Sequence, residues 1–237
     1  MLLAIGAPEV PKFGALSVSL DPSLGKKIES AHQPACPPAE VDIPEGTSPE
    51  HDLVLFGNDV DAIFKAKADL SCTLPLWSVG NLHSVPVAPF KKMGRRYAKR
   101  LDAIAGLIKK GLGKGRQEIP FVPDADAATQ IFARPHIVDL ACGGKAVAFI
   151  TEFGQDEGSL ESKELVYVLQ GFSEDGADFI FGWVPVQFTG TFPEYNSDGF
   201  LPYAKRIESI LRKAKTTQYK PSLDAIEASM SSIAKHP

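Results

Sequence analysis

Long apolar runs are missing from this sequence of 237 residues. Because no stretch of about 18 consecutive apolar residues occurs, the sequence predicts no transmembrane helix. Residues 1–7 are apolar apart from one glycine, but the basic segment and the longer apolar core of a secretory signal are incomplete. We interpret residues 1–12 as a flexible N-terminus or as the remnant of a signal peptide, followed by a single domain over residues 13–237.

Cysteine is scarce too, with Cys36, Cys72 and Cys142 far apart along the chain. At most one intrachain disulfide can form, and whether Cys36 pairs with Cys72 stays open. No two cysteines have the short spacing of a zinc knuckle or a redox pair. The histidines show no HxH, HxxxH or HExxH spacing. The sequence therefore predicts no metal site and no cofactor.

Familiar catalytic motifs are lacking as well. There is no G-x-S-x-G elbow, which removes the commonest sign of a serine hydrolase. The glycines of residues 111–116 superficially suggest a phosphate loop, but they follow a predicted helix instead of preceding one. Helix amides point at an anion only at the N-terminal end, so the order is wrong for that function.

One enzymatic hypothesis remains, an active site assembled from distant residues. Glu152 and His136 are its candidate catalytic residues. Alternation along the predicted strand places Glu152 on the same face as Ala148 and Ile150, where burial would raise the pKa of a carboxyl group. Alternatively, Glu152 lies at the solvated end of the strand. A lone glutamate without an identifiable partner favours a structural role, and the sequence leans toward a protein that is not an enzyme.

The composition is that of an ordinary globular protein, with 44% hydrophobic and 23% charged residues. Two apolar runs, residues 136–140 and 146–153, flank a Gly-Gly pair, and two more, 164–170 and 178–186, flank an Asp-Gly pair. Both patterns are typical of β-hairpins. Four strands joined by short turns predict an antiparallel meander over about residues 136–189.

Other segments predict further strands and helices. Residues 15–20 and 51–57 are strand candidates, Asp21 is placed to cap a short helical turn, and a brief helix is expected after Asp59. Residues 33–50 are too rich in proline for a helix, and residues 73–90 are expected to be strand-like. Helices are expected over about residues 92–112 and, on both sides of Pro221, at the C-terminal end. The expected fold class is α+β.

Charge is distributed unevenly. Residues 91–116 contain ten basic residues and one acid, whereas the whole chain has a net charge of −4. A basic amphipathic helix of this kind can hold an anionic surface such as lipid, cell-wall polymer or nucleic acid. The candidate contact residues are Arg95, Arg96, Lys99 and Arg100. Pairing with the acidic remainder of the chain is the alternative, and the scarcity of aromatic residues argues against nucleic acid.

Several short segments occur in an order that resembles a family of uncharacterised bacterial secreted proteins or lipoproteins. The similar segments are residues 16–24, 49–55, 119–123, 149–155, 164–171 and 184–186. The resemblance implies one domain and an extracytoplasmic setting, periplasmic or secreted, and it implies no activity or cofactor. A cytoplasmic location stays open because the signal peptide is incomplete.

The sequence does not identify a biochemical function. The hypothesis that we prefer is a non-enzymatic extracytoplasmic binding or structural domain, with an anionic surface or another protein as partner. The two alternatives are the enzyme built around Glu152 and the anionic-surface protein that binds through residues 91–116.

Overall fold

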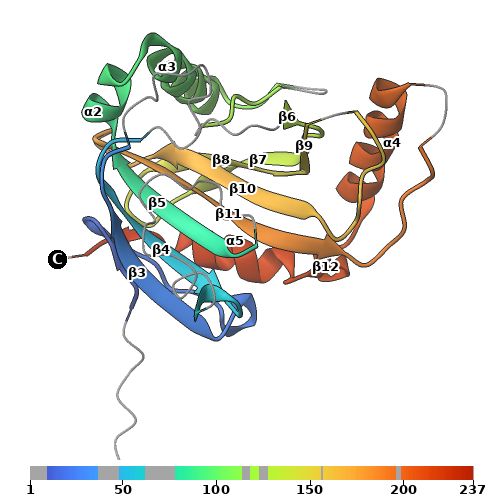
Figure 1. Cartoon of the computed structure of the whole chain (residues 1–237), viewed down its shortest axis with the longest axis horizontal. Helices are drawn as coiled ribbons and strands as arrows, with labels where there is room; N and C mark the ends of the chain where they lie inside the picture. Colours follow the sequence, from blue (N-terminus) through green and yellow to red (C-terminus); the bar gives the residue numbers. More distant parts are fainter. Residues whose placement is uncertain are drawn as a thin grey trace, which may run out of the picture.

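The computed structural model describes residues 10–36, 48–61, 78–113, 118–122, 128–155, 157–195 and 199–236. An antiparallel sheet dominates these residues, and its strands follow the order β3-β4-β5-β11-β10-β8-β7 (Figure 1). With helices packed on both faces, it confirms the expected α+β class. The strands are β3 (Lys27–Gln33), β4 (His51–Gly57), β5 (Gly80–Pro86), β7 (Ala133–Asp139), β8 (Lys145–Thr151), β10 (Leu165–Phe172) and β11 (Asp178–Phe188).

The meander predicted for the C-terminal half is confirmed. Strands β7, β8, β10 and β11 pair with their neighbours in antiparallel register. Gly143 and Gly176 occupy the connecting turns with φ angles of 82° and 68°. A left-handed backbone of this kind favours glycine, which explains why the Gly-Gly and Asp-Gly pairs mark the hairpins.

The N-terminal half completes the same sheet. The predicted strand at residues 51–57 is β4, and β5 joins it to the meander by pairing with β11. Strand β3 at the sheet edge was not predicted, and residues 27–30 are exposed, so no apolar alternation marks it. The predicted strand at residues 15–20 was wrong in length, because only Leu16–Ser17 form a strand, β2.

Helices lie on both faces of the sheet (Figure 1). Helices α2 (Val87–Lys92) and α3 (Arg95–Lys110) cover one face, and α4 (Phe200–Lys213) and α5 (Leu223–Ser231) pack against the other. The two C-terminal helices are thereby confirmed. The helix expected over about residues 92–112 spans Arg95–Lys110 as α3, and Lys92 ends the separate helix α2. Residues 87–90 are helical where a strand-like segment was expected, since Pro89 lies in the first turn and removes no internal hydrogen bond there.

Short elements complete the described residues. Asp21 caps the helical turn η1 (Pro22–Leu24) as predicted, because its Oδ1 accepts from the Ser23 amide at 2.8 Å. The remaining elements are β1 (Lys12–Phe13), β6 (Ala128–Thr129), β9 (Phe153–Gly154), β12 (Tyr219–Lys220), β13 (Ala234–Lys235) and η2 (Thr216–Gln218). Within the described residues no helix is both long and apolar enough to cross a membrane.

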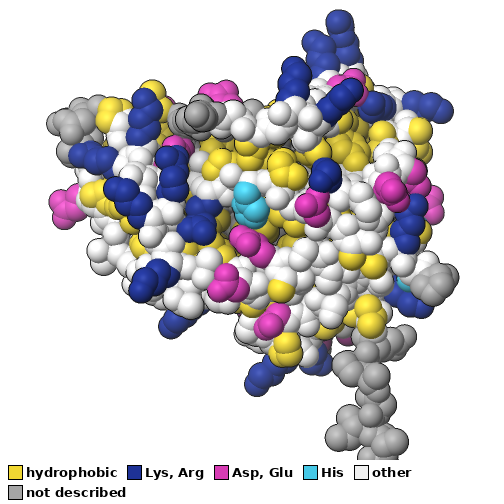
Figure 2. All heavy atoms as spheres, turned by 180° about the vertical axis from the view of Figure 1, so that it is seen from behind, with side chains coloured by type: hydrophobic (Ala, Val, Ile, Leu, Met, Phe, Trp, Pro, Cys, Tyr) yellow, Lys and Arg dark blue, Asp and Glu magenta, His cyan; other side chains and the backbone are white. Residues whose placement is uncertain are grey.

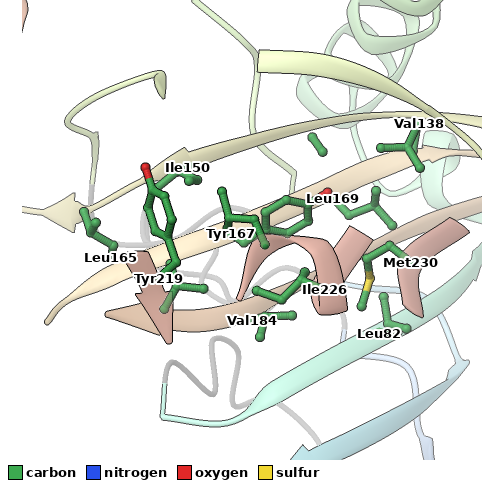
Figure 3. Packing of buried hydrophobic residues seen from close by; sticks show 14 of the residues in the cluster. Leu82, Val138, Ile150, Leu165, Tyr167, Leu169, Val184, Tyr219, Ile226 and Met230 are labelled. Atoms are coloured by element: carbon green, nitrogen blue, oxygen red, sulfur yellow. The ribbon is translucent and has the colours of Figure 1, made fainter. Parts of the chain in front are cut away.

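The sheet separates two apolar clusters. Side chains such as Tyr167, Leu169 and Val184 pack against Ile226 and Met230 of α5 (Figure 3). On the opposite face, Val168, Phe181 and Trp183 pack with α2 and α3. The aromatic residues of the meander are therefore divided between the two faces, with Tyr167 on one and Phe181 and Trp183 on the other.

The described cysteines differ in whether they form a disulfide. Cys36 is part of a disulfide, whereas Cys142 is buried and carries a free thiol. Cys72 lies outside the described residues, as do residues 62–66 of the helix expected after Asp59 and residues 114–116 of the basic segment.

Helix α5 depends on a single side-chain cap that can be tested. Ser222 Oγ accepts a hydrogen bond from the Ala225 amide at 3.3 Å. We expect Ser222→Ala to lower the free energy of unfolding in urea by about 1 kcal/mol, the usual value of such a cap. Ser231→Ala is the matched control, because Ser231 Oγ bonds carbonyls inside the same helix and caps nothing at its start. Equal losses in both variants would contradict the capping role.

Candidate basic surface and isolated acid–base residues

The basic segment forms a helix whose two sides differ in chemistry. Tyr97, Leu101 and Ile104 are buried against the sheet. Seven cationic side chains of α2 and α3 are exposed, and we call five of them the basic face: Lys92, Arg95, Lys99, Lys109 and Lys110. Because a helix turns by about 100° per residue and rises 1.5 Å, Arg95, Lys99 and Lys110 form one stripe roughly 22 Å long.

Few carboxylates neutralise this surface. Lys91 pairs with Asp102 at 2.6 Å on the same two helices. Within the described part of the chain, none of the five side chains of the basic face has a carboxylate at ion-pair distance. Pairing with the acidic residues that the structure describes therefore does not account for these five charges.

The first turn of α3 places cations at the positive end of the helix dipole. Arg95 and Arg96 occupy the first turn, which contains no acid, and Gly94 provides no side-chain cap. A cation at the positive end of the helix dipole costs about 0.3–1 kcal/mol. Residues that destabilise the local structure, as these two cations do, occur at functional sites more often than elsewhere.

The four predicted contact residues are in different environments. Arg95, Arg96 and Lys99 are exposed, whereas Arg100 is half-buried and donates from Nη1 to the Phe121 carbonyl at 3.1 Å. Burial, followed by the charge of Arg96, lowers the pKa of Arg100. Arg100 therefore anchors residues 118–122 against the helix and is less available to a ligand than the other three.

Cations also gather on a second helix. Figure 2 shows Lys and Arg side chains at upper right, over α2 and α3, and on the left, over α4. The exposed cations of α4 and of the two residues after it include Lys205, Arg212, Lys213 and Lys215. This second group gives a matched control for any experiment on the basic face.

Glu152 is buried, as the strand pattern suggested, but it has a structural partner. It lies just beyond the end of β8 with 8% exposure, and its Oε2 accepts from the Glu161 amide at 2.8 Å. Burial raises the pKa of Glu152 to about 7, and the charges of Glu164 and Glu161 add to the shift. The carboxyl group fastens the segment after β9 to the end of the sheet.

His136 lies on edge strand β7, away from Glu152. Its Nδ1 donates to the Arg134 carbonyl at 2.9 Å, and its Nε2 lies 3.4 Å from Glu227 Oε1. That second separation is within ion-pair range, but the geometry is not that of a hydrogen bond. His136 pairs with Ala148, four residues before Glu152, so roughly 13 Å of strand separates them. The structure does not bring the two candidate catalytic residues together.

A buried pair of histidines was not anticipated from the sequence. His51 Nε2 lies 3.0 Å from His83 Nδ1, and His51 Nδ1 lies 2.7 Å from the Pro49 carbonyl. Because a carbonyl only accepts, His51 carries its proton on Nδ1, and His83 must donate from its own Nδ1. His83 Nε2 is then an acceptor, and it has no hydrogen-bond partner among the described residues.

Both imidazoles are held neutral by their surroundings. His83 is fully buried and stacks on Phe181 with ring centroids 4.4 Å apart. Burial lowers the pKa of His83 well below its usual value and lowers that of His51 as well. No sequence spacing could reveal this pair, because only the register of β4 on β5 brings residues 32 positions apart into contact.

Metal binding finds no support in this arrangement. Among the described residues there is no group of three or more His, Cys, Asp or Glu side chains placed to hold a metal ion. Comparisons of the chain with protein-family models, with curated proteins and with solved structures find no match.

Proposed function

We propose that this chain is a non-enzymatic binding domain that acts outside the cytoplasm and holds a linear polyanion on its basic face. The observation that carries the proposal is the set of five exposed cations on α2 and α3 that no carboxylate of the described residues neutralises. Closely spaced cations bind a polyanion because each phosphate that they neutralise releases condensed counterions.

A polymer suits this surface better than insertion into a lipid bilayer. An interfacial helix needs a free apolar side that enters the headgroup region. In α3 that side is used by the fold, because Tyr97, Leu101 and Ile104 are buried in the cluster on the sheet. What α3 offers to a partner is charge, along a stripe long enough to contact several repeating anionic groups.

The extracytoplasmic setting rests on two arguments. One is the resemblance of short segments to secreted bacterial proteins. The other is the disulfide at Cys36, since disulfides form and persist mainly in oxidising compartments.

The test is a binding titration with long-chain inorganic polyphosphate at several salt concentrations. We expect affinity to fall steeply as salt rises. A variant with Lys92, Arg95, Lys99 and Lys110 replaced by Gln should reduce the slope of log K against log salt by about 3, at roughly 0.7–0.9 for each cation removed. Arg96 and Arg100 stay unchanged, so that the hydrogen bond from Arg100 to the Phe121 carbonyl is preserved.

The matched control removes four cations elsewhere, with Lys205, Arg212, Lys213 and Lys215 replaced by Gln. It changes the net charge equally and should leave the slope nearly unchanged. An equal loss in both variants would show a response to net charge alone, and an affinity independent of salt would also refute the proposal. Vesicles containing phosphatidylglycerol form a parallel arm, where we expect weaker binding than to the polymer.

A further inference from the structure

A pocket lies at the end of the sheet where β4, β5 and β11 lie next to the β1–β2 turn. Its volume is about 670 Å³, and it is lined by Asp52, Ser84 and Asp178 from these three neighbouring strands. In the register, Asp52 pairs with Ser84, and Asp178 pairs with Pro86. Because alternate residues of a strand share a face, the two carboxylates flank the hydroxyl on one side of the sheet.

Ser84 points to a ligand independently of the acidic residues. It is only 5% exposed and lines the pocket. Its hydroxyl makes no hydrogen bond within the described part of the chain. The serine as a whole is buried, but its Oγ is not among the fully buried atoms, so this free hydroxyl is accessible to a polar partner in the pocket.

The carboxylates keep acceptor capacity as well. Asp52 Oδ1 accepts from His32 Nδ1 at 2.9 Å, which leaves Oδ2 for another donor. Asp178 makes no ion pair with the described residues. Burial, and then the charge of Asp175, raises the pKa of Asp178, so a nearby cation would be favourable.

Gly14 keeps the entrance open. Its φ angle is +61°, which favours glycine, and a Cβ atom there would lie 3.4 Å from Ser84 Oγ and 3.6 Å from Asp52 Oδ2. A larger side chain on this turn would occupy the space above both groups. The glycine therefore leaves the hydroxyl and the free carboxylate oxygen accessible from the pocket.

The residues that line the pocket favour an elongated ligand. Met93, Pro86, Pro89 and Ala15 contribute apolar surface, while Glu50 and His32 stand at the rim. His32 is held between Glu50 and Asp52, at 3.0 and 2.9 Å. Asp52 and Asp178 belong to strands two positions apart and are offset by two residues along the strands, which places their backbones roughly 12 Å apart. We propose that this pocket binds a short aliphatic diamine, with one ammonium group on Asp52 and Ser84, the other on Asp178, and the methylenes against Met93.

Titration calorimetry with amines of graded length tests this directly. We expect 1,5-diaminopentane to bind with one-to-one stoichiometry, 1,3-diaminopropane more weakly, and n-pentylamine at least about 10-fold more weakly, because it leaves one carboxylate unpaired. Asp178→Asn and Asp52→Asn should each reduce the affinity for 1,5-diaminopentane about 10-fold, with a smaller loss for Ser84→Ala. Thermal unfolding of each variant establishes that the fold is retained.

Glu157→Gln removes an exposed carboxylate that does not line the pocket, and it should leave binding unchanged. The proposal fails if no diamine gives a binding isotherm, or if both Asp variants bind like the wild type. Equal affinities of the monoamine and the diamine would show a site for one cation and overturn the two-point contact. Binding of a lysine-rich peptide but of no free diamine would indicate a docking surface for protein instead.

Discussion

Glu152→Gln is expected to stabilise the protein at pH 8 and to change its stability little at pH 4.5. In the fold, burial holds the pKa of Glu152 at about 7, against an ordinary value of 4.5. Ionising the buried carboxyl at pH 8 therefore costs roughly 3 kcal/mol, and partial access of solvent reduces the expected gain of the variant to about 2 kcal/mol. The glutamine keeps the carbonyl oxygen that accepts from the Glu161 amide.

The sign follows from proton binding. A carboxyl whose folded pKa is raised favours the fold below pH 4.5, and this contribution is lost as the pH rises through 7. The difference between variant and wild type in urea unfolding should thus grow from pH 4.5 to pH 8. Glu157→Gln, an exposed neighbour in sequence, should show no such growth. A constant difference across this range would mean that the Glu152 carboxyl titrates like an exposed one.

His83→Gln is expected to make the protein less sensitive to acid. The folded pKa values of His83 and His51 are lowered by burial, so below pH 6.5 the unfolded chain binds protons that the folded chain does not. Each such histidine makes stability fall by up to about 1.4 kcal/mol per pH unit as the pH decreases. The glutamine retains an N–H donor for His51 Nε2 but takes up no proton.

Unfolding free energies measured between pH 6.5 and 4.5 test this expectation. The loss per pH unit should be smaller in His83→Gln than in the wild type. His32→Asn is the control, because the bond to Asp52 raises the pKa of this exposed histidine and leaves it protonated throughout most of that range. An unchanged slope in His83→Gln would contradict the neutral buried pair. Glu152 titrates in the opposite sense, so each variant has to be compared with the wild type at the same pH.

Local signals in the sequence explain which elements could be predicted. The hairpins of the meander carry their own turn glycines, and α3 and α4 carry regular apolar stripes that need no distant partner to be recognised. Strand β3 has no such signal, because most of it is exposed at the edge of the sheet. The pairing of β5 with β11 joins residues about a hundred positions apart, and nothing in either strand specifies that choice.

The candidate sites also differ in whether local signals in the sequence reveal them. The basic face could be recognised because its charges are close together in sequence. Asp52, Ser84 and Asp178 come together only through the register of three strands. His51 and His83 depend on the same register, and neither residue stands out in the sequence. Glu152 was recognised as a candidate from the strand pattern, but the pattern left its burial open, and its hydrogen bond with the Glu161 amide depends on how the chain turns after β9.

The pairing of β2 with β13 also constrains when the protein can finish folding. Ser17 lies opposite Ala234, and the Cys142 amide donates to the Ile233 carbonyl at 2.7 Å. A ribosome adds about 5–20 residues per second, so the 217 residues from Ser17 to Ala234 take roughly ten to forty seconds to synthesise. During that time β2 lacks β13 as a partner on one side, so the small sheet of β1, β2 and β13 is incomplete until residues 234–235 have been synthesised. Pairing of β2 with β13 therefore comes late in synthesis, after every strand of the large sheet has been made.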